Sequence, residues 1–331
     1  MDESVRYFAT ILQGDKLMAE LINTLKQEPF ILTEGSVVER LKRLTPYPLD
    51  EQIIHGGFIY EEEAGKALES IYREYIEIAR AHQVPILMFT PSWRATKERI
   101  DKSPYKGKHV NGDGYRFLDR IRQSYGEYSE RIFIGGLMGC KGDAYKPEEA
   151  LTIGESREYH QEQANSLARA GVDFLYASTM PALPEIIGIA HALSLTGKPY
   201  LLSFMLGKEG RLLDGTLIHK AIEEVEENIA FPPLGYFFNC AHWTFVRKAL
   251  EAIHQETPQY LSRVLGCQAN TSCMSPEELD KATRLECESP QSFGEGLAGL
   301  HWEFGLKILG GCCGSLPEHI KMLADKIKPL T

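Results

Sequence analysis

The stretch GVDFLYASTMPALPEIIGIAHALSLTGKPYLLSFM, residues 171–205, joins two apolar, β-rich runs through an amphipathic segment. The runs at 173–177 and 199–205 have the length and composition of buried strands, and 183–195 has the apolar spacing of a helix. A helix between two such strands predicts a parallel βαβ unit with a right-handed crossover. The fold therefore depends on how often the chain repeats this unit.

The same alternation runs along the whole chain. Strands are predicted at 30–33, 84–90, 132–138, 173–177, 199–205, 236–240, 263–268 and 307–309. Helical patterns are found at 63–82, 155–170, 183–195, 216–229, 243–254, 276–284 and 293–304. Eight such units in about 300 residues predict an α/β fold of the closed (β/α)8 TIM-barrel type. A doubly wound open sheet is the alternative, but no glycine-rich nucleotide motif follows the first strand to support it.

Three segments lie outside the repeat. Residues 1–28 are predicted to form an extra N-terminal helix, which could cap the barrel or serve an interface. Residues 45–60 and 97–115 are predicted to be long loops. Because no proline- or serine-rich linker divides the chain, we expect a single domain over 1–331 with a helical extension over 1–28.

Composition excludes several classes of partner. The formal net charge of −10 argues against a general surface for nucleic acid or anionic membranes. No apolar run approaches the roughly 20 residues of a membrane span, and the start, MDESVRYFATILQGDK, does not have the pattern of a secretory signal. We expect a cytoplasmic protein whose partners are small molecules; a homo-oligomer is compatible with the sequence.

The cysteines point to a metal. The chain has seven, an odd number without the spacing of a disulfide framework, yet Cys312 and Cys313 are adjacent and flanked by glycines. Cys240 ends the sixth predicted strand and the pair follows the eighth, so a barrel brings all three to its catalytic face. Three converging thiolates indicate a soft metal, usually zinc, with a fourth position open for chemistry. The alternative is a buried pair or a vicinal disulfide.

Two segments carry a family resemblance. GYFFNCAHW (235–243) and KILGGCCGSLPEHI (307–320) resemble the zinc-dependent homocysteine S-methyltransferase family, which includes betaine- and S-methylmethionine-using enzymes and a domain of cobalamin-dependent methionine synthase. Weaker similarity extends over ILTEGSVVERL (31–41), REYIEIA (73–79), ARAGVDFLYASTMPALPE (168–185), SFMLGKEGRLLDGT (203–216) and ANTS (269–272).

The resemblance implies a function as well as a barrel. It implies zinc bound by Cys240, Cys312 and Cys313, with a thiol acceptor in the open zinc position. That thiol would take a methyl group from a small sulfonium or quaternary ammonium donor. The acceptor is expected to be homocysteine and the product methionine, which would place the protein in methionine biosynthesis.

Two positions depart from the family pattern. The family usually has Asp-Gly-Gly after the first strand, where this chain has Thr33-Glu34-Gly35. After the fourth strand the family usually carries a Glu that helps to hold the amino group of homocysteine, and this chain has Ser178. Losing a carboxylate partner costs an ammonium group about 2–5 kcal/mol in a desolvated site. Either Glu34 supplies the missing charge and homocysteine remains the acceptor, or the acceptor is a different thiol.

Two residues after the second predicted strand are further candidates for substrate binding. Arg94 could hold a substrate carboxylate in a bidentate manner, or it could be a surface residue near Glu98. Trp93, with Phe238 and Trp243, could form a cation–π wall for the donor, or the three rings could simply be packed.

Other polar residues near the predicted strand ends have weaker signals. Asn239 and Asn270 could donate to the cysteines or to substrate. Cys267 is the nearest rival metal ligand, and His242 and His319 could each supply a fourth one. A third hypothesis is a zinc- or redox-sensing barrel without turnover.

Overall fold

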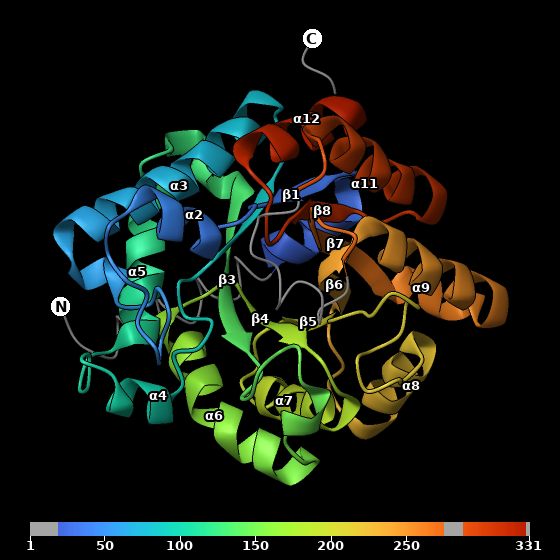
Figure 1. Cartoon of the computed structure of the whole chain (residues 1–331), viewed down its shortest axis with the longest axis horizontal. Helices are drawn as coiled ribbons and strands as arrows, with labels where there is room; N and C mark the ends of the chain where they lie inside the picture. The colour runs from blue at the N-terminus through green and yellow to red at the C-terminus, as the bar shows by residue number, and fades with distance from the viewer. Residues whose placement is uncertain (1–18, 275–286, 329–331) are drawn as a thin grey trace.

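A computed structural model describes residues 19–274 and 287–328, and it contains a closed barrel of eight parallel strands. The strands follow one another around the ring in sequence order, and β8 pairs with β1 (Figure 1). The predicted barrel and all eight predicted strands are therefore confirmed. Their bounds are β1 Ile31–Thr33, β2 Ile86–Phe89, β3 Ile132–Gly139, β4 Phe174–Met180, β5 Tyr200–Phe204, β6 Gly235–His242, β7 Val264–Asn270 and β8 Ile308–Gly311.

The strands form a barrel because both of their faces are apolar. Inward-facing side chains make one buried cluster, which contains Ile31, Leu87, Phe89, Phe133, Phe174, Tyr176, Leu201, Phe237 and Ile308. Outward-facing side chains pack against the surrounding helices in a second, larger cluster. Strands buried on both faces read as continuous apolar runs, which is the pattern found in the sequence.

A helix over residues 19–27 closes the end of the barrel at which the strands begin. Its Leu21 is 1% exposed and belongs to the interior cluster, against which Leu25 also packs. Leu234 and Leu265, near the starts of β6 and β7, pack against the same cluster. The N-terminal helix is confirmed over 19–27, where it caps the barrel; residues 1–18 lie outside the described residues.

The main helices surround the strands (Figure 1). They are α3 Glu62–Ala81, α5 Val110–Gln123, α6 Ile153–Ala170, α7 Leu183–Ser194, α8 Ile218–Asn228, α9 Trp243–Glu256, α11 Pro290–Phe304 and α12 Pro317–Ile327, with the short α2 Val38–Leu44 and α4 Lys97–Lys102. The helix predicted over 276–284 lies outside the described residues. None of the described helices is both long enough and apolar enough to cross a membrane.

The prediction of a long loop over 97–115 is wrong. This segment contains α4 and the first turns of α5, and both helices lie in the connection between β2 and β3. Gly112 and Gly114 suggested a loop, but both are buried within α5, and Gly114 packs directly against the ring of Pro91. Close packing thus outweighs the low helix propensity of glycine. The other predicted loop, 45–60, is largely irregular and ends in one 3-10 turn at Phe58–Tyr60.

Two strands bulge near their carboxyl ends. The pairing register shifts between Ala177 and Met180 in β4 and between Asn239 and His242 in β6. Each bulge contains a non-glycine residue in the left-handed region: Thr179 and Cys240 both have φ of +54°. Such conformations persist only where neighbouring groups hold them, and they concentrate at functional sites.

Candidate metal centre

Three cysteine sulfurs converge at the end of the barrel where the strands finish. The Sγ of Cys240 in β6 lies 2.8 Å from that of Cys312 and 3.5 Å from that of Cys313, and the latter two lie 4.0 Å apart. Cys312 and Cys313 directly follow β8. Within the described ranges, these are the residues whose Cys, His or carboxylate ligand atoms gather closely enough to hold a metal ion.

The backbone around each cysteine is held by its neighbours. The side-chain amide of Asn270 donates to the Cys240 carbonyl at 3.2 Å, which supports the left-handed conformation of Cys240 in the β6 bulge. The Cys312 amide donates to the Ala269 carbonyl at 2.7 Å. At Gly311 a Cβ atom would overlap the Ser315 side chain, so a glycine is needed immediately before the pair.

The spacing and ionisation of the thiols fit a soft metal. A tetrahedral zinc site with Zn–S bonds of about 2.3 Å places its sulfurs about 3.8 Å apart, and two of the three distances are close to this value. Hydrogen bonds from Cys240 and Cys313 lower the pKa of the Cys312 thiol. The same contact with Cys312 raises the pKa of Cys240. The centre therefore favours one thiolate, and a metal that binds all three sulfurs must displace protons.

Tyr145, which the sequence reasoning missed, lies close to this centre. The nearby Cys240 thiol, followed by burial and by Cys313, opposes ionisation of the Tyr145 hydroxyl and so raises its pKa. Its loop between β3 and α6 is held at both ends by Glu185, whose carboxylate accepts from Lys141 N at 2.7 Å and Leu151 N at 3.3 Å. The only sequence signal for Tyr145 is its position in a loop after a barrel strand.

Glu34 follows β1 as predicted, but its carboxyl is not a free charge at the mouth. Burial raises the pKa of Glu34 to about 8, although the Phe89 amide donates to Oε2 at 3.0 Å. The carboxyl is therefore largely protonated at pH 7. The neighbouring Gly35 packs so closely on Tyr75 of α3 that a Cβ atom would overlap the Tyr75 ring.

Asn239 supports the mouth through its side-chain oxygen. This Oδ1 accepts from the Thr179 amide at 2.8 Å and from the Ser203 hydroxyl at 2.6 Å. We expected an amide donor to the cysteines or substrate, whereas the observed bonds make Asn239 an acceptor between β4, β5 and β6. Thr179 in turn accepts from the Trp93 indole at 3.1 Å. Ser178 precedes it in β4 and is buried, at 4% exposure.

Arg94 contacts a neighbouring ring and a loop, and its predicted binding of a substrate carboxylate stays a prediction. Its guanidinium stacks on the Trp93 ring at 5.4 Å from the centroid. Its Nη1 donates to the carbonyls of Cys140 at 3.0 Å and Gly142 at 2.7 Å. Arg94 thus anchors the β3–α6 loop and covers one face of Trp93.

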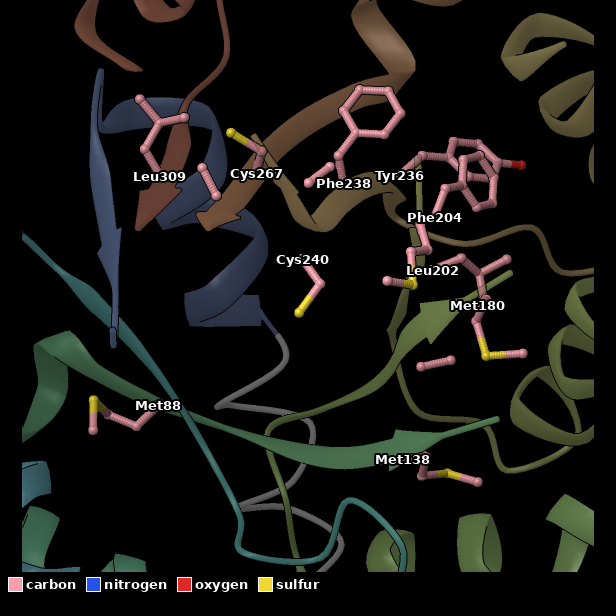
Figure 2. Close-up of a cluster of buried hydrophobic side chains, with 14 of the residues drawn as sticks. Met88, Met138, Met180, Leu202, Phe204, Tyr236, Phe238, Cys240, Cys267 and Leu309 are labelled. Carbon is pink, nitrogen blue, oxygen red and sulfur yellow. The ribbon is translucent and has the colours of Figure 1, made fainter. Parts of the chain in front are cut away.

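The other residues considered as ligands or as aromatic wall lie apart from the three sulfurs. Cys267 and Phe238 face the helix layer, and Figure 2 shows the Cys240 side chain pointing away from both. The predicted three-ring wall is therefore wrong for Phe238. His242 caps α9 and lies 3.2 Å from Glu288, while the Nε2 of His319 contacts the Glu288 carbonyl at 3.0 Å.

Comparison with known proteins connects the chain to one family. A family model described as Homocysteine S-methyltransferase matches residues 31–327. Homocysteine S-methyltransferase YbgG of Bacillus subtilis (strain 168) is 26% identical over 57% of this chain and 58% of its own length. Betaine–homocysteine S-methyltransferase 1 of Bos taurus is 22% identical over 81% of this chain and 65% of its own. The matches thus span less than two thirds of these relatives.

A solved structure shows the same fold. The homocysteine methyltransferase MmuM from Escherichia coli, in a metallated form, superposes with a TM-score of 0.71 at 17% sequence identity. The match covers 93% of this chain and 99% of MmuM.

Proposed function

Because this chain belongs to the homocysteine S-methyltransferase family, we propose that it transfers a methyl group from a small activated donor to a thiol bound at Cys240, Cys312 and Cys313. The proposed acceptor is homocysteine and the product methionine. The observation that carries the proposal is the convergence of three sulfurs within 4.8 Å of one another at the mouth of the barrel. A zinc ion held there would accept the substrate thiol in its fourth position and favour the thiolate.

The described residues around the sulfurs are suited to positioning rather than to acid–base chemistry. Asn270 and the β6 bulge orient Cys240, while the Ala269 carbonyl holds the backbone of Cys312. A sulfonium or quaternary ammonium donor leaves as a neutral thioether or amine, so the leaving group needs no proton from the protein. We place the reaction in the cytoplasm, where thiols are kept reduced.

A second candidate is the same reaction on a thiol that has no amino group. Two observations favour it: the buried residue on β4 is Ser178, and the Glu34 carboxyl has a pKa of about 8. An ammonium group near these two side chains would meet a hydroxyl and a largely neutral acid at pH 7. Such groups stabilise a cation less than an ionised carboxylate does.

Calorimetric titration of the zinc-loaded protein distinguishes the two acceptors. L-Homocysteine is compared with 4-mercaptobutyrate, which has the same carbon chain and carboxylate but no amino group. Zinc-dependent binding and methylation of homocysteine, tighter than the analogue by tenfold or more, would establish the first candidate. Tighter binding of 4-mercaptobutyrate would favour the second. If neither betaine nor S-methylmethionine methylates either thiol, both candidate functions are contradicted. The hypothesis of a zinc- or redox-sensing barrel without turnover would then be favoured.

A further inference from the structure

A second pocket lies beside the mouth of the barrel. It has a volume of about 390 Å³ and is formed by the segments that follow β2 and β3, the same end of the barrel as the three sulfurs. Its walls include Arg94, Arg99, Lys141, Tyr159 and Gln52. We call it the rim pocket.

Two guanidinium groups meet at the rim pocket through a shared backbone carbonyl rather than through a carboxylate. The Nη2 atoms of Arg94 and Arg99 both donate to the Lys141 carbonyl, each at 3.1 Å. Burial, followed by the charge of Arg99, lowers the pKa of Arg94. In the parts of the chain that the structure describes, neither arginine forms an ion pair, and the Lys141 ammonium lies over the Tyr159 ring at 5.3 Å.

The carboxylates that also line the pocket have partners of their own. Glu98 forms an ion pair with Lys102 on α4. Glu149 accepts from the Asp143 amide at 2.9 Å and lies 3.5 Å from Lys146. Asp143 accepts from the Tyr145 amide at 3.0 Å and lies 3.9 Å from Lys146. Arg94, Arg99, Lys102 and Lys141 thus exceed these three carboxylates by one positive charge at the pocket wall, in a protein whose formal net charge is −10.

The two arginines also keep donors available. The observed contacts of Arg94 are with three consecutive loop carbonyls of residues 140–142, and those of Arg99 are with the carbonyls of Gln52 and Lys141. Each guanidinium has more N–H groups than these contacts use. Neutral carbonyls orient the guanidiniums but do not cancel their charge.

We propose that the rim pocket binds the phosphate group of a small phosphorylated molecule. A phosphate group brings about −1.5 to −2 charges and several acceptor oxygens, which matches two guanidiniums and an ammonium better than a single carboxylate does. The pocket volume is within the usual range of roughly 300–1,000 Å³ for small-molecule sites. The site is separate from the cysteine centre and needs no metal.

Binding at the rim pocket should be reported by Trp93. Arg94 stacks on the Trp93 ring, and the Trp93 indole donates to Thr179 in β4. A ligand that draws the Arg94 guanidinium toward the pocket changes the environment of the indole. This contact gives a readout that is independent of methyl transfer.

The test titrates the protein, both zinc-loaded and metal-free, with pyrophosphate, inorganic phosphate and citrate, followed by calorimetry and tryptophan fluorescence. Because pyrophosphate and citrate also bind zinc ions, only binding seen in both preparations counts. Saturable 1:1 binding of pyrophosphate is expected, tighter than binding of citrate and weakened by added salt. Arg99→Gln and Lys141→Gln should each weaken it by tenfold or more. Lys220→Gln is the control, because Lys220 is exposed on α8 and paired with Glu223.

Zinc content and thermal unfolding show whether each variant is folded, and two independent variants are used so that one failure to fold leaves a test. Absence of saturable pyrophosphate binding would overturn the proposal. Equal binding by the folded Arg99 and Lys141 variants, or tighter binding of citrate, would do the same. Homocysteine titration is a separate measurement, so failure of the proposed methyl transfer would not be confused with failure of this site.

Discussion

At the scale of single residues, the proposed metal centre depends on one sulfur that comes from a different strand. Cys312 and Cys313 are neighbours in sequence, whereas Cys240 reaches them from β6. Without Cys240 only two adjacent sulfurs remain, one fewer than the three ligands of the proposed zinc site. Oxygen is also a harder donor than thiolate, so serine is a poor replacement toward zinc.

We therefore expect Cys240→Ser to lose zinc. Affinity should fall by more than the roughly 10–100-fold that follows the loss of a hydrogen bond supporting a ligand, and competition with a chromogenic chelator measures it. Cys273→Ser is the matched control, because Cys273 is exposed and outside the three-sulfur group. Full retention of zinc by the Cys240 variant would show that these residues do not form the site.

Glu34 makes a pH-dependent contribution to stability. Its pKa rises from 4.5 to about 8 on folding because the carboxyl is buried. Between these pH values the folded protein binds a proton that the unfolded chain does not, so the free energy of unfolding falls as pH rises. The slope is about 1.4 kcal/mol per pH unit. The contribution of Glu34 to stability is lost fully only above its pKa of about 8 in the folded protein.

Glu34→Gln removes this ionisation. From pH 5 to pH 9 the variant should gain about 3–5 kcal/mol in free energy of unfolding relative to the unmodified protein, as measured by urea denaturation. Glu127→Gln, at an exposed position, should show no such trend. A difference between Glu34→Gln and the unmodified protein that stays constant across this pH range would contradict the assignment.

At the scale of elements, asparagine side chains hold the two strained bulges. Asn239 in β6 accepts from Thr179 in the β4 bulge, and Asn270 in β7 donates to Cys240 in the β6 bulge. Each side chain thus supports the left-handed residue of a different strand. The barrel ring supplies this support, because strands distant in sequence are adjacent in space.

Asn239→Ala should destabilise the protein by about 2–4 kcal/mol, since it leaves the buried Thr179 amide and Ser203 hydroxyl without their acceptor. Urea denaturation measures this change. Because Thr179 contacts Trp93, tryptophan emission should shift as well. Asn228→Ala at the end of α8 is the control and should change stability by less than about 0.5 kcal/mol. A change no larger than the control's would remove Asn239 from this supporting role.

At the scale of the whole molecule, the two ends of the barrel have different tasks. The end where the strands begin is closed by the helix over 19–27, whose Leu21 is buried in the interior cluster. The end where the strands finish carries the three sulfurs and the rim pocket. This division between stability and chemistry is typical of (β/α)8 barrels.

Leu21→Ala should therefore lower the free energy of unfolding by about 2–4 kcal/mol while the folded protein still binds one equivalent of zinc. Denaturation and metal analysis on the same preparation test both parts. Leu195→Ala, at a position that is 60% exposed, should have little effect. Loss of zinc from a folded Leu21 variant would show that the two ends are coupled.

Most of the fold was predictable because barrel strands buried on both faces have a distinctive apolar pattern. The eight runs and most of the intervening helices follow from periodicity alone. Helix α5 did not, because Gly112 and Gly114 have low helix propensity and their packing, with Gly114 against Pro91, is not visible in the sequence.

The sequence by itself predicted the barrel and the convergence of the three cysteines, because parallel strands in a closed barrel all end at the same rim. Only the tertiary structure decided the state of Glu34, the partners of Arg94 and Asn239, and the position of Tyr145. Burial and hydrogen bonding depend on neighbours far away in the chain, and no local pattern encodes them. The rim pocket exists for the same reason, since loops after two different strands bring its charges together.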